Sequence, residues 1–327
     1  MKAILIKEFG GTEQLYIGEY DTPVPHKDEL LIKVKATALN RADILQRQGK
    51  YPPPQGASPI MGLEIAGVVE DTGENCKTFK GGDRILALLP SGGYAEYAAI
   101  PEGMAMLIPE NLSFEEAAAI PEVFLTAFQA LNWLANIKPG NTVLIHAGAS
   151  GVGTAAIQLV KYFQSTPLVT AGSKEKLDFC RNLGASLAIN YKEGSFVEKI
   201  LEATNGSGID IIIDFIGAPY WEQNVGCLAL DGRFIMLATM GGSLVEKFDL
   251  RSLFKKRGQF ITSTLRNRSL DYKIRLTEEF ARMILPEFTK GKLKAVVDEV
   301  FDWNDVAKAH QYMEENRNMG KLVLNGM

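Results

Sequence analysis

Cysteine and histidine are scarce in this sequence, which holds three of each among its 327 residues. The cysteines, Cys76, Cys180 and Cys227, are odd in number and far apart in the chain. They therefore predict neither a disulfide framework nor a cysteine-rich zinc site, and they are typical of a protein from a reducing compartment. We expect a cytoplasmic protein.

Long apolar runs and a large excess of one charge are also missing. No uninterrupted apolar segment is long enough to cross a bilayer, so no membrane contact is expected. Charges at Lys2, Lys7 and Glu8 argue against a signal peptide at the N-terminus. The formal net charge is −4 and there is no basic stripe, which argues against a nucleic-acid partner.

A glycine cluster between an apolar strand and an apolar helix is the most informative feature that is present. Val143–Ile145 is followed by GASGVG at 148–153, and a helical pattern of apolar residues continues from there. This arrangement presents backbone N–H groups and the positive end of a helix dipole to a pyrophosphate. The segment matches GxGxxG with Ser150 in place of the middle glycine. It predicts a dinucleotide-binding loop, although a plain turn between strand and helix would use the same glycines.

Two patterns divide the chain. Up to about Pro121, short strands such as Leu30–Ala38 alternate with glycine and proline turns. Beyond it strands and helices alternate, and repeated βα units predict a parallel sheet covered on both faces. The expected strands are Thr142–His146, Leu168–Ala171, Leu187–Asn190, Ile209–Phe215, Arg233–Leu237 and Gln259–Thr262, and the expected helices include Gly153–Phe163 and Lys174–Leu183.

The C-terminal part returns to the first pattern. After about Leu265 we expect one long helix, Tyr272–Thr289, and then short strands that end in KLVL. These last strands are expected to rejoin the first domain, which makes that domain discontinuous.

Three segments carry a family resemblance: Ala38–Val69, Pro121–Leu131 and the HAGASGVG loop, with further similarity in NRNMGKLVL near the C-terminus. Together they resemble the zinc-independent quinone oxidoreductases, the zeta-crystallin-like branch of the medium-chain dehydrogenase/reductase superfamily. The NRAD, QRQG and GLE segments are similar to those of the tumour-suppressor-inducible quinone oxidoreductase type.

The resemblance implies an α/β fold with two domains. A GroES-like β-rich catalytic domain is expected over residues 1–122 and 267–327, and a Rossmann doubly wound parallel sheet over residues 123–266. It also implies NADPH as the reductant and a homodimer or homotetramer.

The same resemblance implies that the zinc ligands of the superfamily's alcohol dehydrogenases are missing from this chain. The positions of the cysteine and the histidine are occupied by Asn40 and Leu63, and no four-cysteine loop is present. Zinc needs converging thiolate, imidazole or carboxylate ligands. We interpret His146 as a packed strand residue rather than an acid/base catalyst, and His26 and His310 as surface residues. The sequence predicts a site without metal.

The end of the second Rossmann strand predicts a preference for NADPH. It ends in Ala171, Gly172 and Ser173, without the acid that bonds the ribose hydroxyls of NAD. A hydroxyl and lysine ammonium groups can bind a 2′-phosphate instead. The alternative is that Lys174 and Lys176 are only the solvated first turn of the next helix, where Glu175 can pair with a lysine.

Individual cofactor contacts are implied by the resemblance alone. The 2′-phosphate pocket would be formed by Gly172, Ser173, Lys176 and Tyr191, with Arg317 near the adenine end. Asn40 and Thr126 would lie by the nicotinamide, and Gly151, Val152 and Gly153 by the pyrophosphate. Three segments that follow strands would border the nicotinamide half: Phe215–Gly217, Ala238–Gly241 and Thr264–Arg266, with Gly217, Gly241 and Leu265 as the contacts. The two glycines would also suit ordinary turns.

Quinones are electron-poor and need little help from a Lewis acid, so one hydrogen-bond donor near the carbonyl would suffice. Tyr51, in a loop stiffened by Pro52, Pro53 and Pro54, is one candidate, and packing against those prolines is the equal alternative. Asn40 is the second candidate, as a polar group that faces the nicotinamide rather than a turn-forming asparagine. The aromatic residues of one helix face are interpreted as core: Phe124, Phe128 and Trp133.

Three functions remain open from the sequence. The first is the reduction of ortho- or para-quinones by NADPH, and the second is the NADPH-dependent reduction of activated carbon–carbon double bonds in enals and enones. The third is a cofactor-binding protein with a structural or RNA-binding role, as the resemblance to zeta-crystallins allows.

Overall fold

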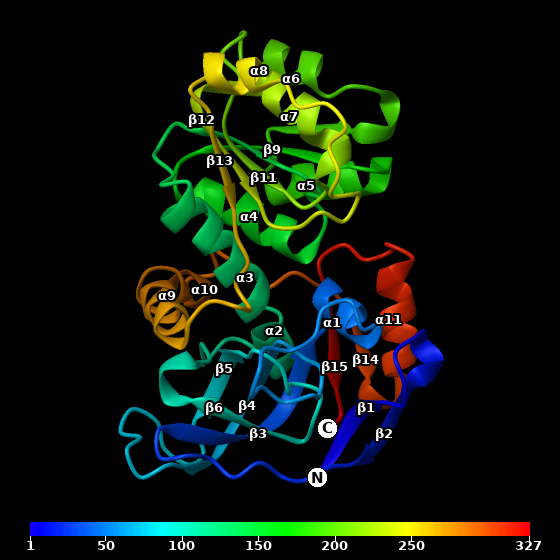
Figure 1. The fold of residues 1–327 in the computed structure, drawn as a ribbon. Coiled ribbons are helices and arrows are strands. Elements are labelled where there is room, and N and C mark those ends of the chain that lie inside the picture. The colour runs from blue at the N-terminus through cyan, green and yellow to red at the C-terminus, as the bar shows by residue number, and fades with distance from the viewer. The chain divides into compact units, whose positions relative to one another are not determined.

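The computed structural model describes residues 1–327, which divide into two compact units. Unit 1 consists of Met1–Leu125 and Leu265–Met327, and unit 2 of Thr126–Thr264 (Figure 1). The first division falls inside helix α3 (Pro121–Phe128), so one continuous helix leads from unit 1 into unit 2. Both divisions lie within a few residues of the boundaries expected from the sequence.

Unit 2 is built on a six-stranded sheet in which every neighbouring pair is parallel. Its strands are β8 (Thr142–Ile145), β9 (Thr166–Ala171), β10 (Leu187–Asn190), β11 (Ile209–Asp214), β12 (Leu228–Met236) and β13 (Gln259–Thr262). The strand order across the sheet is β10-β9-β8-β11-β12-β13. The chain enters the sheet in the middle at β8, continues outward to the edge strand β10, and then returns to form the other half from β11 to β13. Such a sheet binds ligands at the carboxyl ends of its strands, where the order reverses between β8 and β11.

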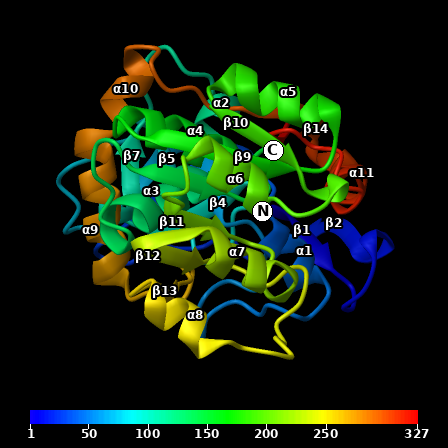
Figure 2. The ribbon, with the colours of Figure 1, turned by 90° about the horizontal axis from the view of Figure 1, so that it is seen from above.

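Helices cover both faces of this sheet (Figure 2). The helices are α4 (Gly151–Tyr162), α5 (Lys174–Leu183), α6 (Val197–Ala203), α7 (Trp221–Cys227) and α8 (Leu250–Lys255). Helices α4 and α5 pack together against β8, β9 and β10, while α6, α7 and α8 pack one against the next. A π-helical stretch, Gln129–Leu134, continues α3. The expected doubly wound sheet is therefore confirmed.

The predicted element bounds hold best where a strong stop signal exists. Helix α5 ends where expected because Gly184 adopts a φ of +117°, which other residues rarely adopt. Strand β12 begins at Leu228 rather than Arg233. Helix α4 begins at Gly151, two residues before the predicted start, because Ser150 caps it with its side chain.

Unit 1 is built on a β-rich, mostly antiparallel sheet with the order β14-β15-β3-β4-β5-β7, in which β6 also pairs with β3. These strands are β3 (Glu29–Ala38), β4 (Glu64–Thr72), β5 (Arg84–Leu88), β6 (Tyr97–Pro101), β7 (Ala105–Leu107), β14 (Val297–Asp302) and β15 (Lys321–Asn325). A separate pair is formed by β1 (Lys2–Ile6) and β2 (Leu15–Glu19). Because β15 pairs with β3, the C-terminal strands complete the N-terminal sheet.

The helices of unit 1 include one correction. They are α1 (Arg41–Arg47), α2 (Phe114–Ala118), α9 (Leu270–Met283), α10 (Leu285–Thr289) and α11 (Val306–Glu314), besides the start of α3. The prediction of one long helix over Tyr272–Thr289 is wrong, because the helix is interrupted at Ile284. Pro286 has no N–H to donate and its ring clashes with the preceding turn, so the chain starts a new helix there.

A second correction concerns His310, which is fully buried rather than at the surface. It lies on the inner face of α11, with Nδ1 3.1 Å from Nη1 of Arg47 and Nε2 3.3 Å from the hydroxyl of Tyr94. Burial, together with the Arg47 charge, lowers the pKa of His310 to about 3, so the ring is neutral. The prediction that His26 is exposed is confirmed, and so is the placement of Phe124 and Phe128 in the core.

The helices of this protein are too short, or too polar, to cross a membrane.

Candidate functional site

The loop between β8 and α4 offers free backbone donors at the positive end of a helix. The Ser150 hydroxyl oxygen accepts a 3.1 Å hydrogen bond from the N–H of Gly153, whereas the N–H groups of Gly151 and Val152 have no acceptor within the chain. A side chain on Gly153 would put a Cβ 2.4 Å from the carbonyl oxygen of Ala147. Two free donors, a tightly packed glycine and the dipole of a 12-residue helix fit a pyrophosphate.

Thr126 adds an unsatisfied polar atom in unit 2. Its hydroxyl oxygen is buried and has no hydrogen-bond partner in the chain. A buried hydroxyl without a partner costs about 1–3 kcal/mol, a cost that a bound ligand would remove. This observation fits the nicotinamide contact that the resemblance implies for Thr126.

The residues expected at the 2′-phosphate lie together at the end of β9. A Cβ on Gly172 would approach the hydroxyl of Tyr191 to 2.6 Å, so Tyr191 packs directly on the Gly172 backbone. Ser173 caps α5 by accepting from the N–H of Lys176 at 3.3 Å, and its own hydroxyl hydrogen stays available to donate. Lys174 forms an ion pair with Asp178 along the helix, at 2.6 Å. The site therefore holds a hydroxyl pair and Lys176 without an acid at the strand end.

His146 follows β8 and is held in a fully buried network. Its Nδ1 lies 2.9 Å from the hydroxyl of Thr170, and its Nε2 lies 2.7 Å from Oδ1 of Asn224. Asn224 donates in turn from Nδ2 to Asp214, at 3.2 Å. Burial lowers the pKa of His146 to about 4. This neutral, fully engaged ring confirms the interpretation of His146 as a packed residue.

Gly217 and Gly241 shape the turns after β11 and β12. Gly217 has a φ of +87°, and a Cβ there would lie 2.6 Å from the carbonyl oxygen of Gly242. Gly241 donates its N–H to the carbonyl oxygen of Ile216, at 2.8 Å. Both glycines lie beyond carboxyl ends of the parallel strands, which is where a nucleotide would bind.

Leu265 and Arg317 belong to unit 1. Leu265 is buried. The Arg317 guanidinium lies 4.3 Å from the ring centroid of Tyr312 and pairs with Glu315 at 3.5 Å. Their cofactor contacts stay predictions.

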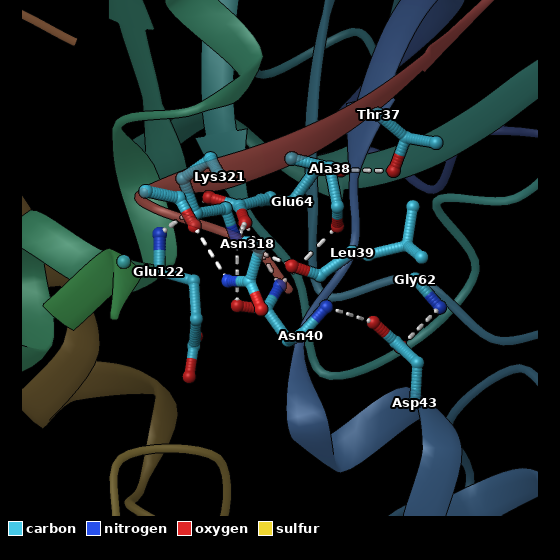
Figure 3. A network of polar contacts seen from close by, with 12 residues as sticks. Thr37, Ala38, Leu39, Asn40, Asp43, Gly62, Glu64, Glu122, Asn318 and Lys321 are labelled. Carbon is cyan, nitrogen blue, oxygen red and sulfur yellow. Dashed lines mark hydrogen bonds and ion pairs between the residues drawn. The ribbon is translucent and has the colours of Figure 1, made fainter. Parts of the chain in front are cut away.

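Unit 1 carries a closed polar network around a buried ammonium group (Figure 3). Lys321, at the start of β15, lies 2.6 Å from the carbonyl oxygen of Leu39, 2.7 Å from Oδ1 of Asn40 and 2.7 Å from Oε1 of Glu64. An ammonium has three N–H donors, and all three are used here. The Lys321–Glu64 pair is almost completely buried on both sides.

The side-chain N–H groups of Asn40 donate hydrogen bonds inside this network. Its Nδ2 donates to Oε1 of Glu64 at 2.8 Å and to the carbonyl oxygen of Ala38 at 3.3 Å. The second Glu64 oxygen accepts from the backbone N–H of Glu122 at 2.7 Å. Asn40 therefore has no N–H left for a ligand, and a contact with the nicotinamide would have to use Oδ1 as an acceptor.

Asp43 fixes the start of α1 beside this network. Its two oxygens accept from the backbone N–H groups of Asn40, at 2.7 Å, and Gly62, at 3.0 Å. Burial raises the pKa of Asp43 to about 6, and these two hydrogen bonds limit the rise.

Tyr51 is held by an arginine. The guanidinium of Arg266 lies 4.9 Å from the Tyr51 ring centroid and donates to its carbonyl oxygen at 3.2 Å. Arg266 also donates to Gln46 at 2.6 Å and to the carbonyl oxygen of Pro90 at 2.7 Å. The Tyr51 hydroxyl has no partner in the chain, so it stays free to donate to a ligand. Burial raises the pKa of Tyr51, which keeps the hydroxyl protonated.

The side chains of this chain do not fit a zinc ion. No three His, Cys, Asp or Glu side chains come together in a group that could hold a metal. Where the resemblance expects ligands, Leu63 is apolar and buried and the Asn40 amide is occupied by Glu64 and Lys321.

Two family descriptions match the chain. The zinc-binding dehydrogenase family matches residues 151–283, and the alcohol dehydrogenase GroES-like domain matches residues 26–110. Human quinone oxidoreductase is 31% identical over 331 residues, which cover 99% of this chain and 97% of that protein. The human synaptic vesicle membrane protein VAT-1 homolog is 30% identical, over 99% of this chain and 86% of that protein.

Solved structures agree over the full length. An NAD-dependent alcohol dehydrogenase superposes with a TM-score of 0.89 at 32% identity, with 100% of both chains covered. Escherichia coli quinone oxidoreductase complexed with NADPH gives 0.88 at 29% identity, also with 100% of both chains covered. The enoyl reductase CurK gives 0.86 at 28% identity, over 99% of this chain and 98% of that one.

Several site residues were missed by the sequence interpretation. Lys321 begins a buried strand, and a charged residue at such a position needs a partner, which was an available signal. Glu122 lies inside Pro121–Leu131, a segment that carries the resemblance, but nothing in that segment singles it out. Arg266 gave no local signal, because its partners Gln46, Tyr51 and Pro90 are distant in sequence.

Proposed function

Because the chain belongs to the medium-chain dehydrogenase/reductase superfamily, as a full-length relative of quinone oxidoreductases, we propose that it reduces quinones with NADPH. A single observation carries the proposal: a nucleotide loop with two free N–H donors, beside a strand end that lacks an acid. When bound, the cofactor supplies a hydride, and the protein supplies position and electrostatics.

The choice of NADPH rests on the end of β9. Ser173 and Tyr191 bring two hydroxyls beside Gly172, and Lys176 follows in the same helical turn. A 2′-phosphate is favoured by hydroxyl and ammonium donors and is repelled by a carboxylate at this position. The NADPH complex of the Escherichia coli quinone oxidoreductase supports the same choice.

The reaction is proposed to proceed without zinc. Asn40 and Leu63 offer no set of zinc ligands. The oxygen of a reduced quinone is a much weaker base than an alkoxide, so quinone reduction needs little help from a Lewis acid. The hydroxyl of Tyr51 would donate a hydrogen bond to the substrate carbonyl, because it has no competing partner and Arg266 fixes the ring.

Reduction of activated carbon–carbon double bonds is the second candidate. It is favoured by the likeness to the enoyl reductase CurK. The same donors would serve it, since hydride transfer to an enone also places negative charge on a carbonyl oxygen.

A substrate panel separates these functions. Purified protein is mixed with NADPH and, in parallel, an ortho-quinone, a para-quinone and an enone, and the loss of NADPH absorbance is followed. We expect at least one of the two quinones to be reduced faster than the enone. A faster enone reaction supports the second candidate, and tight NADPH binding without turnover of any substrate contradicts both.

We also propose that the protein forms homodimers. Strand β13 is an edge of the unit 2 sheet, and an unpaired edge is a template for pairing with a second copy. Apolar side chains close to it in sequence are largely exposed, with Leu250 at 70% and Phe254 at 83%. Exposed apolar surface of this kind marks interaction sites.

A further inference from the structure

The carboxyl group of Glu122 has no partner in the chain. Its backbone N–H is bonded to Glu64 at 2.7 Å, but its side-chain oxygens form no hydrogen bond or ion pair. Figure 3 shows this side chain extending away from Glu64 and Lys321, so it does not take part in the closed network. A partly buried carboxyl without a partner is unusual, because charged groups of this kind are normally paired.

The groups around this carboxyl do not hold it in the charged form. Burial, followed by the nearby negative charges of Glu64 and Asp43, raises the pKa of Glu122 to about 8, against the attraction of Lys321 and Arg266. When Glu122 is ionised, its negative charge raises the pKa of Lys273 and the pKa of Tyr51, so both groups lie near it. The side chain is consequently a carboxylic acid at neutral pH.

Thr126 lies one helical turn further along α3. Residues four apart in a helix share a face. One face of α3 thus carries two side chains with unused hydrogen-bonding capacity, the Glu122 carboxyl and the buried Thr126 hydroxyl. The resemblance implies a nicotinamide contact for Thr126, and within unit 1 the Glu122 carboxyl is close enough to Tyr51 for its charge to raise the pKa of that hydroxyl.

From this geometry we propose that Glu122 is the proton donor of the reaction, a role that rests on the proposed function. When bound, the reduced nicotinamide would supply a hydride, with its electron pair, and would be left oxidised. The substrate carbonyl oxygen gains negative charge, the Glu122 O–H bond breaks, and that proton forms the new O–H bond. Glu122 is left as a carboxylate and takes a proton from water before the next turnover. Tyr51 orients the carbonyl by its hydrogen bond and keeps its own proton.

The first test is a titration that does not depend on turnover. Infrared difference spectra of the cofactor-free protein are recorded from neutral to alkaline pH for the wild type and for Glu122→Gln. The proposal expects a protonated-carboxyl band that disappears as the pH rises through about 8 and that is missing in Glu122→Gln. A spectrum without such a band, or the same band in both proteins, overturns it.

The second test is the pH dependence of kcat. For the wild type, kcat should stay level below pH about 8 and fall above it, because only protonated Glu122 can donate. Glu122→Gln should lower kcat about a hundredfold and remove this alkaline fall, with the Kd of NADPH unchanged. Glu122→Asp should keep the fall at a reduced rate. Glu278→Gln, an exposed carboxyl on α9, is the matched control and should behave as wild type.

The outcomes separate the two proposals. If the wild type reduces a substrate of the panel and Glu122→Gln keeps both its rate and its pH profile, the proton-donor role is wrong and the proposed function stands. If the wild type reduces nothing, the proposed function fails and the infrared titration alone decides whether Glu122 is an acid at neutral pH. A melting temperature for each variant shows whether a lost activity reflects a lost fold.

Discussion

Single residues of this site differ in how much of their hydrogen-bonding capacity is already used. Lys321 and the amide N–H groups of Asn40 are fully engaged, so they position other groups and have no donor left for a ligand. By contrast, the Tyr51 hydroxyl, the Glu122 carboxyl and the Thr126 hydroxyl have no partner in the chain. A ligand would gain binding free energy by forming hydrogen bonds with these unused groups.

Tyr51 gives the first prediction at this scale. Tyr51→Phe should lower kcat/KM about ten- to a hundredfold, because one hydrogen bond that strengthens in the transition state is worth roughly 1–3 kcal/mol. The Kd of NADPH should not change. The comparison is made with a poor and a good quinone substrate. If the variant equals the wild type for both, Tyr51 only packs in its loop, and the hydrogen bond to the carbonyl comes from another group.

Lys176 gives the second prediction about a single residue. Lys176→Ala should weaken NADPH binding by roughly 1.5–3 kcal/mol, since a charge-assisted contact to the 2′-phosphate is lost. NADH binding should stay nearly unchanged, because NADH lacks that phosphate. Both affinities are measured by cofactor fluorescence titration. Lys174→Ala is the control, because Lys174 already pairs with Asp178. Equal losses for NADPH and NADH in Lys176→Ala would contradict the assignment.

Secondary-structure elements meet at the buried network of unit 1. Lys321 begins β15, Glu64 begins β4, Asn40 precedes α1, and Glu122 lies in the first turn of α3. The ion pair and the hydrogen bonds made to it therefore fix the ends of four elements relative to one another. It also fixes the backbone from which the Glu122 side chain extends.

Loss of the ammonium should be costly at this junction. Lys321→Met leaves the Glu64 carboxylate buried without a cation, and we expect a loss of about 3–5 kcal/mol in the free energy of unfolding. Urea unfolding measures it. The double variant Glu64→Gln with Lys321→Met should recover part of the loss, since neither charge of the buried pair remains. The control Lys290→Met removes an ion pair with an exposed lysine and should cost about 0–1 kcal/mol. A Lys321→Met loss no larger than the control contradicts this account.

Elements could be predicted from the sequence where local signals decide them. Gly184 ends α5, and the apolar and glycine pattern at 143–153 defines β8, its turn and α4. The break at Pro286 was available in the sequence, but the apolar period on both sides concealed it. His310 was misplaced because its neighbours Arg47 and Tyr94 come from distant segments. The partners of Lys321 and Arg266 likewise depend on tertiary contacts that periodicity cannot give.

At the scale of the whole molecule, the two units carry different groups. Unit 2 has the doubly wound sheet and the nucleotide loop, whereas unit 1 has Tyr51, the buried network and the Glu122 carboxyl. Helix α3 is shared between them and carries both Glu122 and Thr126.

Assembly gives a prediction at this scale. If two copies pair through the region of β13, a charge on the exposed apolar residue Phe254 should disfavour the dimer. Wild type and Phe254→Asp are compared by light scattering after size-exclusion chromatography. We expect a dimer for the wild type and a shift toward monomer for the variant. Phe9→Asp, an exposed aromatic residue in unit 1, is the control and should remain dimeric. A monomeric wild type would contradict the proposal.

We propose that this chain reduces quinones with NADPH and without zinc. The most direct measurement compares initial rates of quinone reduction with NADPH and with NADH, in protein before and after exhaustive treatment with a chelator, together with a metal assay. We expect faster turnover with NADPH, no stoichiometric zinc and a rate unchanged by the chelator. The absence of quinone reduction, equal use of NADH, or activity that is lost on chelation and restored by zinc would contradict it.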